Sequence, residues 1–79
     1  MTADAFTEIE QAAACQAEFV ELYRQFLPNC GTHWIAYPLA RSIEATYQRW
    51  RRILGDTAYT LKLEALRIVR AEMAGEELT

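Results

Sequence analysis

The chain has 79 residues, of which 52% are hydrophobic and 24% are charged, and its formal net charge is −3. This length predicts one domain with a thin core, and the balance of apolar and charged residues excludes a disordered chain. The negative charge argues against generic binding to nucleic acid or to an anionic membrane. No apolar run approaches the roughly 20 residues that a membrane-spanning helix needs.

The start of the chain lacks the basic, apolar and small-residue succession of a secretory signal peptide. Its two cysteines, Cys15 and Cys30, are too few for a disulfide framework. We therefore expect a soluble, cytoplasmic protein in which both thiols are reduced.

The first predicted element is a long helix over residues 3–27. At about 100° per residue, its apolar positions fall on an arc about 200° wide, which is wider than one neighbouring helix needs. The arc comprises Phe6, Ile9, Ala12, Ala13, Cys15, Phe19, Val20, Leu22, Tyr23, Phe26 and Leu27. Glu10, Glu18 and Glu21 lie on the opposite side. The width of the arc predicts more than one neighbour for this helix.

Residues 28–38 begin and end with proline and are predicted to form a loop. Gly31 favours a turn, and Tyr37 is biased away from the α conformation because it precedes Pro38. The next helix is therefore expected to begin at Pro38, the alternative being a start at Thr32 with a kink at the proline. Since the segment is too apolar for a solvated linker, we expect it to fold down and cap the core.

A second helix is predicted over residues 38–54, with one apolar and one basic side. The apolar side comprises Leu39, Ala40, Ile43, Tyr47, Trp50, Ile53 and Leu54. The opposite side, which we call the basic face, comprises Arg41, Gln48, Arg49, Arg52 and, at its boundary, Arg51. We expect Trp50 and Ile43 to share a core with Phe19 and Leu66.

Gly55 and Asp56 predict a short connection, because glycine ends helices and aspartate caps their N-termini. A third helix is predicted over residues 57–74, followed by a frayed tail over residues 75–79. It has one apolar stripe of Tyr59, Leu63, Leu66, Val69 and Met73 and another of Leu61, Ala65 and Ile68. The chain is therefore predicted to be a single all-α domain, a three-helix bundle in which a long helix precedes a helical hairpin.

Few residues could carry chemistry. Cys30 and His33 have a spacing that a metal could use, with Cys15 as a candidate third ligand. A structural zinc site needs four ligands, usually in two close pairs, and a nucleophilic cysteine needs an orienting group and an oxyanion site. The sequence offers neither, and it has no glycine-rich phosphate loop. We expect no metal, no cofactor and no enzymatic activity.

Surplus apolar surface is the main indication of function. Three short helices cannot cover both the wide arc of the first helix and the two stripes of the third. The predicted apolar interaction residues are Phe19, Leu22, Phe26, Leu61 and Ile68. They indicate a homo-oligomer, most simply a dimer, or a small regulator, adaptor or inhibitor that binds a larger protein.

The basic face supports a second hypothesis, in which its arginines neutralise the phosphates of a nucleic acid. Residues 39–64 are arranged superficially like a helix-turn-helix, but the helix that begins at Thr57 has only Lys62 as a cation near its start. A protein partner is therefore the principal expectation, and nucleic-acid binding is the alternative.

Overall fold

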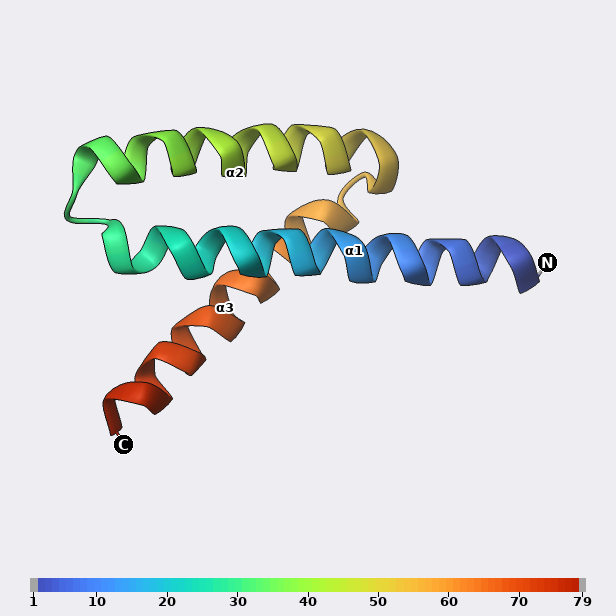
Figure 1. Cartoon of the computed structure of the whole chain (residues 1–79). Helices are drawn as coiled ribbons and strands as arrows, with labels where there is room; N and C mark the ends of the chain where they lie inside the picture. Colours follow the sequence, from blue (N-terminus) through green and yellow to red (C-terminus); the bar gives the residue numbers. More distant parts are fainter. Residues whose placement is uncertain (1, 79) are drawn as a thin grey trace.

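The structure is a computed structural model that describes the backbone of residues 2–78 and the side chains of residues 7–75. It consists of α1 (Thr2–Phe26), the 3-10 turn η1 (Leu27–Asn29), α2 (His33–Leu54) and α3 (Thr57–Leu78) (Figure 1). Residues 2–78 contain no strand. The predicted all-α three-helix bundle is confirmed.

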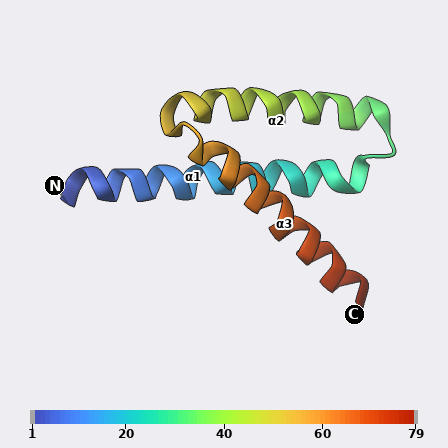
Figure 2. The ribbon, with the colours of Figure 1, turned by 180° about the vertical axis from the view of Figure 1, so that it is seen from behind.

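The helices α1 and α2 lie side by side and antiparallel, and α3 crosses α1 obliquely (Figures 1 and 2). In Figure 1 α1 passes in front of α3, and in Figure 2, seen from behind, α3 passes in front of α1. The third helix therefore covers one side of the α1–α2 layer. We call the other side of this layer the open side.

The chain reverses direction between α1 and α2 through η1. Pro28 lies in the first turn of η1, where its missing N–H removes no helical hydrogen bond. The Asn29 side chain donates to the carbonyl of Gln25 at 2.7 Å, and the amide of Thr32 donates to the carbonyl of Asn29 at 2.9 Å. These bonds satisfy the end of α1 and direct the chain into α2.

The second helix begins at His33, so the predicted start at Pro38 is wrong and the alternative near Thr32 is right. Thr32 is extended, and its carbonyl accepts the amides of Ile35 at 3.0 Å and Ala36 at 2.8 Å. Pro38 lies inside the helix and costs one backbone hydrogen bond. A residue before proline, here Tyr37, prefers to avoid the α conformation, but this preference is weak. The hydrogen bonds of the N-terminal turn and the burial of Ala36 outweigh it.

The segment between the two prolines does not cap the core, contrary to the prediction. Of its apolar side chains on α2, only Ala36 is buried, whereas Trp34 is 76% exposed and Tyr37 is 54% exposed. Because the segment is helical, only one of its sides can face the rest of the bundle. Its aromatic side chains lie on the other side.

The connection to α3 is as short as predicted. Gly55 has a φ of +64°, which favours glycine, and its amide donates to the carbonyl of Arg51 at 2.9 Å. The third helix continues through Gly75 to Leu78, so the predicted frayed tail is wrong for residues 75–78, and Thr79 lies outside the described residues. A glycine lowers helix propensity by only about 1 kcal/mol, and α3 continues through it.

The core lies where the three helices meet. It consists of Cys15, Phe19 and Tyr23 from α1, Ile43 and Trp50 from α2, and Ala58, Ala65 and Val69 from α3. The predicted burial of Phe19, Ile43 and Trp50 is confirmed, and Leu66 packs against this core while partly buried. Of the predicted apolar arc of α1, the second half is buried, whereas Ile9 in the first half is 68% exposed. The side chain of Phe6, also part of this arc, lies outside the described side chains.

The bundle is flat and elongated, with principal extents of 46 × 29 × 15 Å. Its radius of gyration is 14.1 Å, against about 12 Å for a compact domain of this length. Its accessible surface is 5704 Å², against about 4,900 Å² for a compact monomer of 9.1 kDa. The chain therefore exposes about 800 Å² more surface than its mass requires.

Candidate interaction surface

All five residues of the basic face are exposed on α2, and one of them joins α2 to α1. The guanidinium of Arg49 pairs with the carboxylate of Glu18, and the indole Nε1 of Trp50 donates to the same carboxylate at 2.9 Å. Glu18, predicted on the solvent side of its helix, thus accepts two bonds from α2. Arg49 is therefore partly neutralised within the chain.

The other members of the basic face differ in what they contact. Gln48 donates to Glu44 at 2.9 Å, and the guanidinium of Arg41 lies 6.0 Å from the centre of the Tyr37 ring. Within residues 7–75, Arg51 and Arg52 have no ion-pair or hydrogen-bond partner through their side chains. The positive charge of Arg41, Arg51 and Arg52 is therefore not balanced by a carboxylate of the described part of the chain.

The structure adds an aromatic end to the basic face. The helical spacing of α2 brings six exposed or partly exposed positions into one line on its outer side, which we call the outer row: Trp34, Pro38, Arg41, Ala45, Gln48 and Arg52. Tyr37 flanks this row, and its ring lies 5.6 Å from that of His33. Sequence reasoning missed Trp34 because the helix was expected to begin after it. The spacing of four, three, four, three and four residues was the signal that could have found it.

Most of the predicted apolar interaction residues belong to the core of the chain itself. Phe19 is fully buried, and the others except Ile68 are partly buried against the core: Leu22, Phe26 and Leu61. Only Ile68 is exposed, at 37%. Phe19 is therefore out of reach of a partner, because the neighbouring helices cover the second half of the apolar arc of α1. Ile68 is the most exposed of the five predicted residues.

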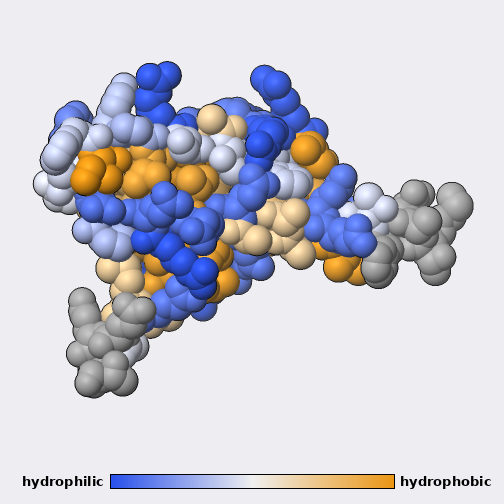
Figure 3. All heavy atoms as spheres, in the orientation of Figure 1, coloured by the Kyte–Doolittle hydropathy of each residue, from blue (hydrophilic) through white to orange (hydrophobic). Residues whose placement is uncertain are grey.

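Other apolar side chains are exposed instead. Besides Trp34 and Tyr37, they are Ile9, Ile35, Ile53, Tyr59 and Leu63. Figure 3 looks at the open side and shows a hydrophobic patch between α1 and the first half of α2, with a milder hydrophobic area over the middle of α1. The open side is thus a mixed apolar and charged surface.

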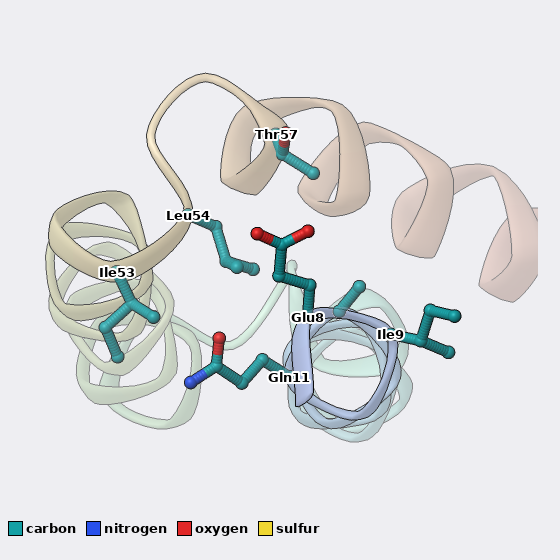
Figure 4. A pocket seen from close by; sticks show the side chains of 7 residues that line it. Glu8, Ile9, Gln11, Ile53, Leu54 and Thr57 are labelled. Carbon is teal, nitrogen blue, oxygen red and sulfur yellow. The ribbon is translucent and has the colours of Figure 1, made fainter. Parts of the chain in front are cut away.

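A hollow of about 450 Å³ lies where the start of α1, the end of α2 and the start of α3 meet. It is lined by Glu8, Ile9, Gln11, Ala12, Ile53, Leu54 and Thr57 (Figure 4). Figure 4 shows the carboxylate of Glu8 pointing between Leu54 and Thr57. Glu8 is the one titratable side chain of this lining, so the hollow offers no acid–base pair of the kind used in catalysis.

The cysteines and the histidine do not converge. Cys15 is buried in the core, where desolvation and then the charge of Glu18 raise the pKa of its thiol to about 11. Cys30 is exposed at the turn after η1 and donates weakly to the carbonyl of Phe26 at 3.5 Å, and His33 is exposed on α2. Across the described residues, no three His, Cys, Asp or Glu side chains come together in a way that could hold a metal.

None of the described helices is both long and apolar enough to cross a membrane. No protein-family model, no curated protein and no solved structure matches the chain.

Proposed function

We propose that this chain is a non-enzymatic protein–protein interaction module that regulates a larger protein as an adaptor or inhibitor in the cytoplasm. The observation that carries this proposal is the outer row of α2, which presents Trp34, Arg41 and Arg52 on an exposed helix beside Tyr37. Tryptophan, tyrosine and arginine are the side chains that contribute most of the binding energy at protein interfaces. A stable monomer has no structural need to expose a tryptophan to 76% on the same side of a helix as two arginines.

The open shape supports the same proposal. The surface in excess of that of a compact monomer, about 800 Å², is close to what one partner contributes to an interface of standard size, about 800 Å². The partner surface is acidic, because Arg41, Arg51 and Arg52 lack a carboxylate partner in the described part of the chain. These charges would raise the rate of association with an acidic partner and would favour such a partner over others.

Nucleic acid is the alternative occupant of the outer row, since arginines and exposed aromatic rings also bind phosphates and stacked bases. Two observations count against it. The carboxylates of Glu18 and Glu44 lie within hydrogen-bond distance of Arg49 and Gln48, in the middle of the surface that a polyanion would follow. The net charge of −3 adds long-range repulsion.

The experiment is capture from an extract of the native cells, with and without nuclease, on the immobilised parent chain and two variants. Arg41→Glu/Arg52→Glu reverses two charges of the outer row, and Arg67→Glu/Arg70→Glu reverses the same number on α3. After nuclease treatment we expect the parent and the α3 variant to capture acidic proteins. We expect the outer-row variant to capture none of them. Capture that disappears with nuclease, or that both variants retain equally, would contradict the proposal.

A further inference from the structure

The hollow at the junction of the three helices has the features of a small-molecule site. Its volume, about 450 Å³, lies within the range of about 300–1,000 Å³ that such sites occupy. Each of α1, α2 and α3 contributes to its lining, so a bound molecule would contact residues that lie far apart in the sequence. The described lining includes no member of the outer row, so the hollow is separate from the surface to which the proposed function assigns a partner.

One part of the lining is apolar. Ile9 and Ala12 come from α1, and Ile53 and Leu54 come from the end of α2. Ile9 is 68% exposed and Ile53 is 50% exposed, so both present apolar surface to water. An apolar body in the hollow would cover part of this surface, which favours binding.

The polar part of the lining consists of oxygen acceptors. Glu8 and Gln11 on α1 and Thr57 at the start of α3 bring a carboxylate, an amide and a hydroxyl to the hollow. Figure 4 shows the carboxylate of Glu8 pointing between the end of α2 and the start of α3. Within residues 7–75, none of these three side chains has an ion-pair or hydrogen-bond partner. The oxygens are therefore free to accept bonds from a ligand.

We propose that the hollow binds a small organic cation, in which a primary ammonium group is carried on an apolar body. The ammonium group pairs with the carboxylate of Glu8, and its other N–H groups can donate to the oxygens of Gln11 and Thr57. The apolar body lies against Ile53 and Leu54. This site is additional to the function proposed above and does not depend on it.

The charge of the lining favours a cation over an anion. Glu8 is the one charged side chain among the described lining residues, and it would repel an anion. The start of α3 is the positive end of its dipole, which attracts this carboxylate but offsets only about half of its charge. The hollow therefore keeps a negative potential that an ammonium group would neutralise.

The composition of the lining also favours an organic cation over a metal ion. A calcium ion takes about six to eight oxygen ligands, several of them carboxylates, whereas the described lining has one carboxylate. The apolar side chains would contribute nothing to a metal ion. They provide contact area for a ligand with an apolar body.

The test is a titration of the folded parent chain with three probes of similar shape, followed by the amide shifts in NMR spectra. The probes are 2-phenylethylammonium, the neutral 2-phenylethanol and the anionic phenylacetate. We expect the ammonium probe to bind with a dissociation constant of about 1 mM or lower and to shift the amides of the lining residues. It should also raise the thermal midpoint, because it binds only the folded chain. We expect the other two probes to bind at least about tenfold more weakly.

Matched variants separate the charge from the apolar contact. Glu8→Gln keeps the shape of the side chain and removes its charge, and we expect it to weaken ammonium binding at least about tenfold. Glu10→Gln removes a carboxylate of the same helix that does not line the hollow, and it should bind like the parent. Ile53→Ala should weaken binding about fivefold, whereas Ile35→Ala, on the same helix but outside the lining, should not.

Equal affinity of the parent for the ammonium and the alcohol would overturn the ammonium site, as would unchanged affinity in Glu8→Gln or amide shifts centred outside the lining. The comparison of probes needs only the parent chain, so it decides even if a variant unfolds. A parent that binds no ammonium probe but captures acidic proteins through Arg41 and Arg52 would refute this site alone and leave the proposed function standing. Ammonium binding without such capture would refute the proposed function alone.

Discussion

Glu18 shows how single residues hold the bundle together. Its carboxylate accepts from both the indole Nε1 of Trp50 and the guanidinium of Arg49, and so joins α1 to the basic side of α2. The helical pattern predicted Glu18 on the solvent side and Trp50 in the core. The bond between them could not be predicted, because it depends on how far α2 is rotated about its own axis relative to α1.

Trp50 tests this junction. We expect Trp50→Ala to lower the free energy of unfolding by about 3–5 kcal/mol, because it leaves a large cavity in a thin core. Trp50→Phe keeps most of the ring and removes the donor to Glu18, and should cost about 1–2 kcal/mol. Urea unfolding followed by circular dichroism measures both. Equal losses in the two variants would show that the hydrogen bond, and not the packing, dominates at this position.

The two thiols should differ sharply in reactivity. Burial raises the pKa of Cys15 from its ordinary value of 9.0 to about 11, so at pH 8 iodoacetamide should modify exposed Cys30 and leave Cys15 untouched until the chain unfolds. Because the pKa of Cys15 is higher in the folded state, the folded state favours the protonated thiol. The stability gained from burying this thiol is fully present below about pH 9 and is lost as the pH rises to about 11. Mass spectrometry of the peptides reads out the labelling. Equal modification rates in the folded protein would place Cys15 outside the core.

At the scale of elements, the sequence predicted the number, order and approximate ends of the helices but misplaced the start of α2. The missing information was non-local: Pro38 disfavours a helix before it, but burial of Ala36 against the rest of the bundle offsets that preference. Ile9 is the converse case. Its phase on α1 matches the buried side chains, but α1 extends past the end of α2 there, and Ile9 stays 68% exposed at the edge of the hollow.

The contrast between local helical pattern and non-local packing also explains what could be predicted of the candidate interaction surface. The arginines of the basic face follow from the helical phase within residues 38–54 and are exposed as expected. Trp34 continues the spacing of these residues, but the expected start of the helix at Pro38 left it out, and the structure shows that the helix begins at His33. The helical pattern is consistent with Phe19 either in the core or at an interface, and the arrangement of the three helices shows that it is buried.

Pro38 offers a test of the early start of α2. In Pro38→Ala the new amide can donate to the carbonyl of Trp34, which stabilises the folded state. The more flexible unfolded chain offsets part of this gain. We therefore expect the free energy of unfolding to rise by about 1–2 kcal/mol. Thermal or urea unfolding, at equal chain concentration, measures the change. A clear loss of stability would indicate that the helix begins after the proline.

The second half of α3 is fastened to α1 by Arg24, whose guanidinium donates to both carboxylate oxygens of Glu72 at 3.0 and 2.8 Å. The hydrogen bond and charge of Arg24 lower the pKa of Glu72, so this contribution is present at neutral pH and is lost as the pH falls through the lowered value. We expect Arg24→Ala to speed amide hydrogen exchange after residue 70 of α3 and to leave exchange in α2 unchanged. Unchanged exchange in α3 would mean that core packing alone holds this half of the helix.

At the scale of the whole molecule, the shape and the charges lead to the same conclusion. A layer of two helices covered on one side only leaves a flat, exposed surface, and this surface carries glutamates on α1 and arginines on α2 at matching intervals. In the single chain these charges face solvent, where a binding partner would meet them first.

Capture of acidic proteins from a nuclease-treated extract of the native cells tests the proposed function most directly, because it reports on the outer row of α2. We predict that the parent chain and Arg67→Glu/Arg70→Glu capture the same acidic proteins and that Arg41→Glu/Arg52→Glu loses them. Equal capture by the two variants, or capture that disappears with nuclease, would contradict the proposed function.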